Sequence, residues 1–362
     1  MTDGGALESG TLLAARQGRL ARLTLNRPGV LNALDRPTCR RIAACLAAWR
    51  DDPAVGTVLI DSASPRAFCA GGDLRAIRAI LVGDGPDAAA AFFRACYRLV
   101  ALLAAYPKPV VSFMDGITMG GGVGLGGHVR HRVVTERTVL AMPETAIGLT
   151  PDAGGSYILS RAPGLSGLRL ALTGRRMGGE EAVAMGFADR VLPAGCLPEL
   201  ARELARRPAG EGVAMFASPG SSAGPAGAAG GAEGDPAAVD RLYDAPDVAT
   251  IRRRLAGSAA PWAAADLAAL ERASPLALEV TFRAYFAARR LPDLNSVLEQ
   301  EYRLVANLVR QPDFAEGVRA RILDKDQAPG WLDPDRVPRA AAACFAPRAE
   351  GLDLSPARAG AD

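Results

Sequence analysis

Hydrophobic residues in the first two hundred positions follow two patterns, short strand-like runs and longer stretches with helical spacing. Residues 22–26 alternate apolar and polar side chains and precede Arg27-Pro28-Gly29, which predicts a strand that ends in a turn. Residues 35–49 carry apolar side chains at helical spacing after an acidic start, which predicts a helix. Short apolar runs at 57–61 and 110–114 predict two more strands. Strands that alternate with helices indicate an α/β fold.

The later part of the chain differs in composition. Gly, Ala, Ser and Pro dominate residues 208–236, and such a segment buries too little apolar surface to offset the entropy of ordering it. We therefore expect a flexible insert over 207–240 after a core over 12–200. Helical patterns return over 241–340, and we expect a disordered tail over 341–362.

Composition and charge exclude several classes of protein. The formal net charge of the 362 residues is only +3, which argues against nucleic acid as a partner. No apolar run reaches the roughly eighteen residues of a membrane span. The six cysteines form no CxxC pair and the chain has only two histidines, so we expect no metal site and reduced thiols. The N-terminus lacks a secretory pattern, and we expect a cytoplasmic protein.

Two glycine-rich segments and one acidic segment are the candidates for chemistry. The sequences FCAGGD at 68–73 and MGGGVGL at 119–125 precede a segment at 143–155 that carries Glu144 and Asp152. Glycine lets backbone N–H groups approach one point because no Cβ obstructs them. Two such donors form an oxyanion hole for a carbonyl that develops negative charge, and the two acids could then act on that carbonyl.

The spacing of the two acids leaves two interpretations open. Glu144 and Asp152 would lie about 12 Å apart along a straight helix. Pro143, Gly148 and Pro151 argue against such a helix, so a bent loop could direct both carboxylates into one pocket. Two nearby carboxylates tend to raise one pKa, which helps one act as an acid and the other as a base. The alternative is that each acid caps a helix.

These segments resemble the crotonase (enoyl-CoA hydratase/isomerase) superfamily and, within it, the 3-hydroxyisobutyryl-CoA hydrolase family. The resemblance starts near residues 23–34, includes the segments above and resumes at 301–331. It implies an α/β fold of the ClpP/crotonase type, with repeated ββα units and C-terminal helices that pack over the active site. It also implies that the backbone N–H groups of Gly72 and Gly121 form the oxyanion hole. The implied partner is an acyl-CoA substrate without a further cofactor, in a homo-oligomer that is a trimer or hexamer.

The resemblance also assigns roles to the acids and marks two departures. Enoyl-CoA hydratases carry glutamates at the positions of Gly124 and Glu144, and hydration needs both, but glycine offers no acid. In a hydrolase, Glu144 attacks the thioester or activates a water, while Asp152 holds the water or protonates the departing sulfur. The hydrolase family has a glutamate at the position of Cys96 to bind substrate. A thiol cannot accept a hydrogen bond as a carboxylate does, so we interpret Cys96 as a small buried apolar residue.

Leu74 and Arg75 follow the first glycine turn, where the superfamily places the adenine pocket for CoA, and Arg75 could meet a phosphate. For His128 and His131 we favour a surface or packing role. The resulting hypothesis is hydrolysis of a short 3-hydroxyacyl-CoA thioester, above all 3-hydroxyisobutyryl-CoA in valine catabolism. The alternatives are an enoyl- or dienoyl-CoA isomerase and a non-catalytic binding protein of the same fold.

Overall fold

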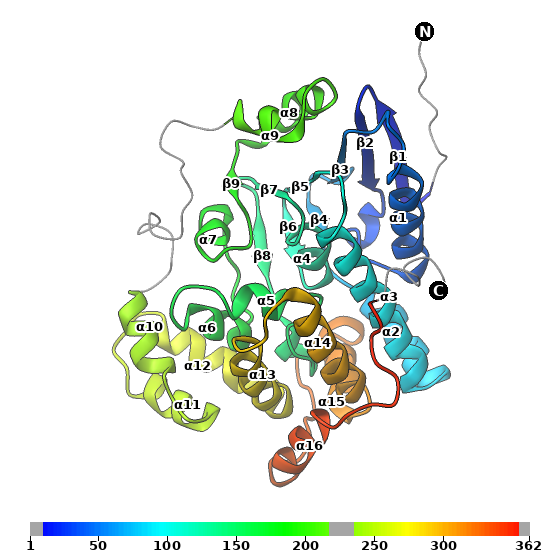
Figure 1. Cartoon of the computed structure of the whole chain (residues 1–362). Coiled ribbons are helices and arrows are strands. Elements are labelled where there is room, and N and C mark those ends of the chain that lie inside the picture. The colour runs from blue at the N-terminus through cyan, green and yellow to red at the C-terminus, as the bar shows by residue number, and fades with distance from the viewer. Residues whose placement is uncertain (1–9, 217–234, 355–362) are drawn as a thin grey trace.

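The computed structural model describes residues 10–216 and 235–354, and in these ranges two β-sheets are surrounded by helices (Figure 1). The larger sheet has the strand order β1-β2-β3-β5-β7-β9. Only β1 and β2 pair antiparallel, and the other neighbours in this sheet are parallel. The smaller sheet has the parallel order β4-β6-β8. The strands are β1 (Leu12–Gln17), β2 (Leu20–Leu25), β3 (Thr57–Ser62), β4 (Ala67–Cys69), β5 (Val110–Met114), β6 (Ile117–Met119), β7 (His131–Val134), β8 (Val139–Ala141) and β9 (Arg190–Val191).

Successive strand pairs contribute one strand to each sheet, and helices follow them. The pairs β3–β4, β5–β6 and β7–β8 each repeat this pattern, which confirms the repeated ββα units that the resemblance implies. The helices of this part are η1 (Pro28–Val30), α1 (Arg36–Trp49), α2 (Leu74–Gly83), α3 (Pro86–Ala104), α4 (Gly121–Gly126), η2 (Glu144–Ile147), α5 (Gly155–Leu159), α6 (Ser166–Thr173), α7 (Gly179–Ala184), η3 (Ala194–Cys196), α8 (Leu197–Leu204) and α9 (Ala209–Ala214).

Local sequence explains where several of these elements lie. Strand β3 is buried along its apolar run, with Val58, Leu59 and Ile60 fully buried, because parallel strands covered on both faces need continuous apolar sequence. Helix α1 begins after Asp35, whose side chain accepts a hydrogen bond from the Thr38 amide at 2.8 Å. This cap satisfies one of the free N–H groups of the first helical turn.

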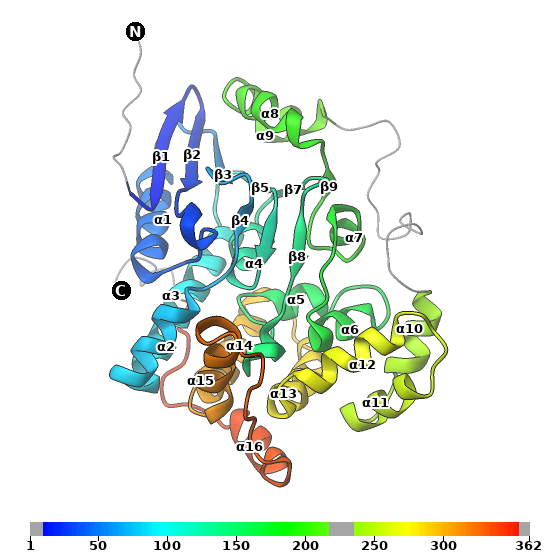
Figure 2. The ribbon, with the colours of Figure 1, turned by 180° about the vertical axis from the view of Figure 1, so that it is seen from behind.

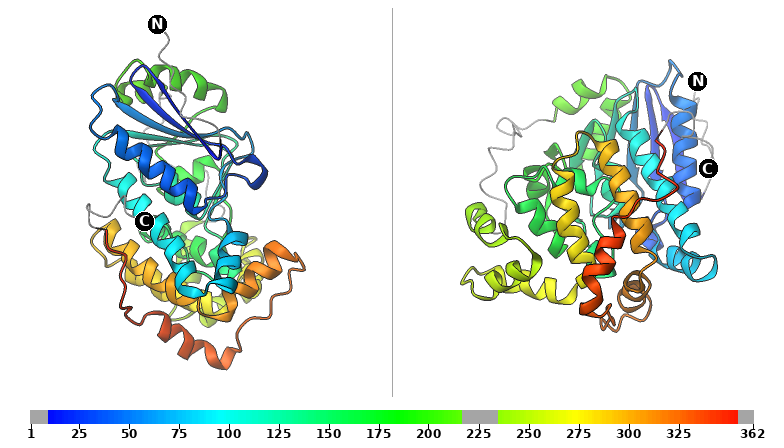
Figure 3. Two further views of the ribbon diagram at one scale, coloured as in Figure 1. Left: turned by 90° about the vertical axis from the view of Figure 1, so that its right-hand side faces the viewer. Right: turned by 60° about the horizontal axis from the view of Figure 1, so that its bottom comes forward.

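Helices make up the C-terminal part of the chain and gather at one end of the molecule, as the views in Figures 2 and 3 show. They are α10 (Pro236–Tyr243), α11 (Val248–Ala256), α12 (Ala263–Arg272), α13 (Pro275–Ala288), α14 (Leu294–Leu308), α15 (Pro312–Val318), the π-helical turn η4 (Arg319–Leu323), η5 (Pro334–Arg336) and α16 (Val337–Cys344). Helix α14 packs against α3, and α15 packs against η2 and α2. The C-terminal helices therefore adjoin the segments that follow the smaller sheet.

The predicted insert over 207–240 is too wide at both ends. Helix α9 buries Ala209 and Val213 against α8, and α10 buries Val239 and Tyr243. These apolar side chains gain enough burial to hold both helices in place. The Gly- and Ala-rich centre of the insert, 217–234, lies outside the described residues.

The predicted disordered tail over 341–362 is wrong for its first fourteen residues. Helix α16 continues to Cys344, which is fully buried, and Leu352 is only 1% exposed. Arg348 donates to the side chains of Asn307 and Asp87 at 3.0 Å each. Contacts with distant helices thus order residues 341–354, and 355–362 lie outside the described residues.

Candidate active site

The candidate site lies at one edge of the smaller sheet, where its three parallel strands end. Strand β4 leads into the turn at 70–72, β6 leads into Gly120 and Gly121, and β8 leads into Pro143 and Glu144. Carboxyl ends of parallel strands meet at the same edge of a sheet, and ligands commonly bind there. Segments from three places in the sequence therefore converge on one position.

The two glycine turns touch each other. A Cβ atom built on Gly121 would lie 3.5 Å from the amide nitrogen of Gly72, and one built on Gly71 would lie 3.5 Å from the amide nitrogen of Gly121. Within the described ranges, neither of these two N–H groups donates to a protein acceptor. Two adjacent, unused backbone donors are the components of an oxyanion hole.

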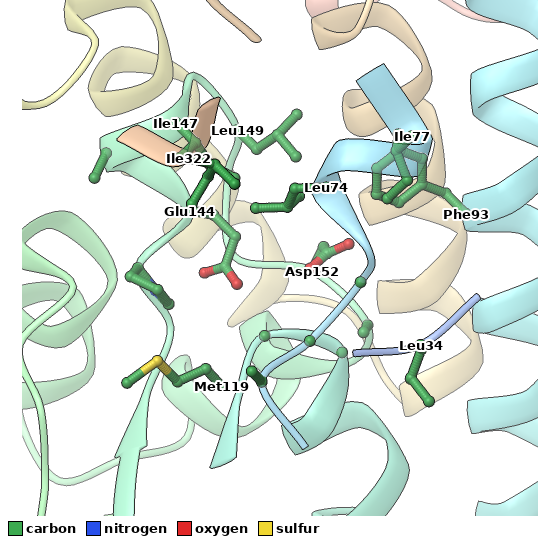
Figure 4. Close-up of a pocket in the computed structure, with 18 of the residues that line it drawn as sticks. Leu34, Leu74, Ile77, Phe93, Met119, Glu144, Ile147, Leu149, Asp152 and Ile322 are labelled. Atoms are coloured by element: carbon green, nitrogen blue, oxygen red, sulfur yellow. The ribbon is translucent and has the colours of Figure 1, made fainter. Parts of the chain in front are cut away.

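A cavity of about 440 Å³ opens beside these turns. Figure 4 shows the side chains of Glu144 and Asp152 projecting into the same space from neighbouring stretches of the chain. The rest of the wall is mostly apolar and includes Leu34, Ile77, Phe92, Phe93, Leu149 and Ile322. An apolar pocket with a few convergent polar groups is typical of a small-molecule site.

Glu144 is the first residue of the short helix η2 and is 6% exposed. Its Oε2 atom is buried and has no hydrogen-bond partner in the described part of the chain. Its Oε1 atom faces Gly120, where a Cβ would lie only 2.7 Å away, so a side chain at position 120 would displace the carboxylate. Burial, and next the charge of Asp152, raise the pKa of Glu144 well above its ordinary value.

Asp152 is 7% exposed and accepts a hydrogen bond of 2.7 Å from the hydroxyl of Tyr97 in α3. Burial raises the pKa of Asp152 to about 6, and the bond from Tyr97 opposes this rise. The pKa values of both carboxyl groups are thus raised, and two such groups in one cavity can hold and exchange a proton.

Neither acid caps a helix. The residue before η2 is Pro143, and the residue before α5 is Gly154. Both carboxylates line the cavity, as the loop interpretation expects, and neither acid is the residue that caps η2 or α5.

Position 124 is closed to any side chain. A Cβ on Gly124 would lie 2.7 Å from the carbonyl oxygen of Ala153 and 3.0 Å from a methyl carbon of Val100. Because Ala153 follows Asp152 directly, an acid at position 124 would have to displace the loop that carries Asp152.

The remaining predicted site residues divide between the cavity and its surroundings. Leu74 and Cys96 line the cavity, and the Cys96 sulfur lies 3.5 Å from that of Cys39 in α1. Arg75 does not line it and donates instead to the carbonyl of Ile322 at 2.6 Å. The Nε2 atom of His128 is buried beneath Gly154, and burial lowers the pKa of this side chain to about 4, which agrees with a packing role.

Sequence reasoning missed four residues around the cavity. Tyr97 holds Asp152, and Glu301 of α14 holds the loop that follows it. Glu301 interrupts the apolar positions of a helix, and an acid at such a position is a signal for a buried polar contact. The sequence gives no comparable signal for Arg272 and Arg321, because only the folded chain brings these two residues to the cavity.

Arg272 and Arg321 supply positive charge at the cavity. Both line it, and Arg272 is exposed. Within the described ranges neither guanidinium forms an ion pair, although Arg321 donates to the side chain of Gln327 and the carbonyl of Arg272. Burial, and next the charge of Arg272, lower the pKa of Arg321. Two neighbouring cations without counter-charges favour an anionic ligand.

The fold and the site together have the features expected of an enzyme that stabilises an oxyanion at a carbonyl group and moves protons with two carboxyl groups. Comparison with known proteins shows the family to which the chain belongs. The family model "Enoyl-CoA hydratase/isomerase" matches residues 20–343, so the chain belongs to this family of acyl-CoA enzymes. It contains no His, Cys, Asp and Glu cluster suited to a metal ion and no membrane-spanning helix in the ranges that the structure describes.

Named relatives and solved structures differ in the activity that they carry. The chain is 39% identical to the mitochondrial 3-hydroxyisobutyryl-CoA hydrolase of Gallus gallus, covering 88% of this chain and 84% of that protein. It is 37% identical to 3-hydroxyisobutyryl-CoA hydrolase 1 of Arabidopsis thaliana, covering 87% and 85%. A carnitinyl-CoA dehydratase from Mycobacterium thermoresistibile superposes with a TM-score of 0.86 at 36% identity, covering 96% and 100%. An enoyl-CoA hydratase from Rhodobacter sphaeroides superposes with a TM-score of 0.83 at 41% identity, covering 93% and 98%.

Proposed function

We propose that this enzyme hydrolyses short 3-hydroxyacyl-CoA thioesters, with 3-hydroxyisobutyryl-CoA as the leading substrate and 3-hydroxyisobutyrate and CoA as products. This reaction belongs to valine catabolism. One observation carries the proposal: two residues with unused backbone donors line the same cavity as Glu144 and Asp152, while position 124 is closed to a second hydratase acid. The names of the relatives from Gallus gallus and Arabidopsis thaliana support the same substrate.

The closed position decides between the two activities carried by the similar proteins. Hydration of an enoyl-CoA uses one acid at position 124 and another at position 144. In this chain Ala153 and Val100 occupy the space that a side chain at 124 would need. Hydrolysis needs no acid there, since Glu144 and Asp152 both line the cavity.

In the proposed reaction the thioester carbonyl accepts hydrogen bonds from the N–H groups of Gly72 and Gly121. These donors stabilise the oxyanion as the acyl carbon is attacked. The bond from the acyl carbon to the CoA sulfur breaks, a water supplies the new oxygen, and the sulfur leaves with a proton. Glu144 acts as nucleophile or general base, and Asp152, held by Tyr97, orients the water or gives the proton to the sulfur.

Arg272 and Arg321 provide a counter-charge for the phosphate groups of CoA. Their guanidinium groups lack ion-pair partners in the described structure and lie beside an otherwise apolar cavity. Arginine matches the geometry of phosphate oxygens. Replacing Arg272 by alanine should therefore raise KM for the CoA thioester and leave KM for the corresponding pantetheine thioester, which lacks the nucleotide, unchanged.

An enoyl- or dienoyl-CoA isomerase is the second candidate, because the raised pKa of Glu144 also suits a group that carries a proton between two carbon atoms. Three assays on the purified protein separate the candidates. They follow free thiol from 3-hydroxyisobutyryl-CoA, hydration of crotonyl-CoA, and migration of the double bond in a 3-enoyl-CoA. Thiol release with poor hydration supports the hydrolase. Robust hydration or isomerisation without thiol release refutes it, and no turnover in any assay supports a non-catalytic binding protein.

A further inference from the structure

Glu301 lies in the middle of helix α14 and is fully buried. Its neighbours on the helix, Leu298, Tyr302 and Val305, are also buried. A carboxyl group in such surroundings carries a large desolvation cost unless its oxygens are hydrogen-bonded. The hydrogen bonds that Glu301 accepts therefore show which segment of the chain this buried carboxyl group holds.

Both oxygens of Glu301 are directed at the loop that follows Asp152. Oε2 accepts the backbone N–H of Gly154 at 2.7 Å, and Oε1 accepts the backbone N–H of Ser156 at 2.9 Å. In this loop Ala153 and Gly154 have positive φ angles of 52° and 84°. Two successive left-handed residues, one of them alanine, are unfavourable unless other contacts hold them.

Helix α14 also reaches Asp152 by a second route. Tyr302, the neighbour of Glu301, packs edge-on against the ring of Tyr97 with the centroids 6.3 Å apart. Tyr97 in turn donates its hydroxyl to Asp152. Helix α14 thus contacts the backbone that follows Asp152 through Glu301. Through Tyr302 it also contacts Tyr97, which donates to the Asp152 carboxylate.

We propose that Glu301 is a positioning residue for the reaction, which holds the 153–156 loop in the conformation that directs the Asp152 carboxylate into the cavity. The inference rests on the proposed function, in which Asp152 orients water or protonates the leaving sulfur. A misplacement of about 1 Å in such a group can slow a reaction by about 10²-fold. Substrate affinity should change little, because Glu301 does not line the cavity.

The first test is the substitution Glu301→Gln, which keeps the length of the side chain but replaces one acceptor oxygen with an NH₂ group. Thiol release from 3-hydroxyisobutyryl-CoA should show kcat lowered by about 10- to 100-fold, with KM within about threefold. The matched control is Glu181→Gln, the same change at another buried glutamate, which pairs with Arg175 in the region of α7. It should leave kcat within about threefold even if its melting temperature falls.

The second test changes the other side of the contact and also applies if Glu301→Gln does not fold. Ser156→Pro removes the N–H that Oε1 accepts, at a position in the first turn of α5 where proline is tolerated. Ser156→Ala keeps that N–H and removes only the hydroxyl, which donates to the carbonyl of Pro151 and also contacts Glu301. We expect Ser156→Pro to lower kcat as Glu301→Gln does and Ser156→Ala to lower it far less, because the backbone contact remains. The double variant Glu301→Gln/Ser156→Pro should lose less than the product of the two single losses, because both break one contact.

The outcomes distinguish failure of the proposed function from failure of the positioning role of Glu301. An unchanged enzyme that releases no thiol refutes the proposed function. An active enzyme whose kcat is unaffected by both Glu301→Gln and Ser156→Pro, with only the melting temperature lowered, overturns the positioning role.

Discussion

Removing the hydroxyl of Tyr97 should shift the protonation of Asp152 in a predictable direction. The hydroxyl donates to Asp152 at 2.7 Å in a fully buried position. The substitution Tyr97→Phe keeps the ring, and with it the edge-on contacts to Phe93 and Tyr302. Only the hydrogen bond to the carboxylate is lost, and the pKa of Asp152 must rise because its charged form loses a donor.

The magnitude follows from the kind of bond. A hydrogen bond to a charged group contributes about 1.5–3 kcal/mol, and about 1.4 kcal/mol corresponds to one pH unit of titration. The limb of the pH–activity profile that Asp152 governs should therefore move up by about one to two pH units. The direction holds whether the reaction needs the ionised or the protonated form of Asp152.

Stability should change with pH in the same sense. Burial raises the pKa of Asp152 from 3.8 to about 6 in the folded protein. Stability from this group is therefore full below the unfolded value and is lost as the pH rises through about 6. In Tyr97→Phe the loss extends to higher pH, so the melting temperature should fall more at pH 8 than at pH 5.

The assay is the pH dependence of kcat/KM for thiol release, measured together with thermal unfolding at the two pH values. Tyr243→Phe is the matched control, since Tyr243 is also fully buried and also donates to an aspartate, Asp266, at 2.7 Å away from the site. A limb that stays in place in Tyr97→Phe, or that moves equally in Tyr243→Phe, would contradict the effect of this hydrogen bond on Asp152.

Four further predictions concern residues in and around the cavity. Glu144→Gln should abolish thiol release, and Asp152→Asn should lower kcat by about 10²–10⁴-fold. Near-normal turnover in Glu144→Gln would contradict the assignment of the catalytic site. The melting temperature of the same Glu144→Gln variant should exceed that of the unchanged protein at pH 8, and by a smaller margin at pH 5. The reason is that a carboxyl group whose pKa is held above its ordinary value lowers stability as the pH rises. A margin independent of pH would contradict this. Gly124→Ala should lose about 1–3 kcal/mol in the free energy of unfolding by overpacking against Ala153, measured by denaturant titration, and a variant of unchanged stability would show that the loop yields. With Cys96 in place of a carboxylate, kcat/KM for isobutyryl-CoA should approach that for 3-hydroxyisobutyryl-CoA, and a preference above about a thousandfold, or about 4 kcal/mol, would mean that other residues bind the hydroxyl.

An isotope experiment separates the two roles of Glu144. Single-turnover hydrolysis in ¹⁸O-water places label in the Glu144 side chain if a mixed anhydride forms and is cleaved at the enzyme's own carbonyl. Label only in the product acid fits attack of water on the thioester or cleavage on the substrate side.

Features that depend on neighbouring residues could be predicted from the sequence. Strand β5 spans Val110–Met114 as its apolar run predicts, and α1 follows the capping residue Asp35. The glycine turns and the bent segment with Glu144 could also be read from the sequence, because glycine and proline act on their own backbone.

The groups that support these residues come from distant parts of the sequence and meet them only in the folded chain. Tyr97 and Asp152 are 55 positions apart, and Glu301 lies 147 positions after Gly154. Helix α9 and residues 341–354 are likewise ordered because their apolar side chains contact other helices. Burial is a property of the whole fold, and burial both raises the pKa values of Glu144 and Asp152 and stabilises segments whose local composition favours disorder.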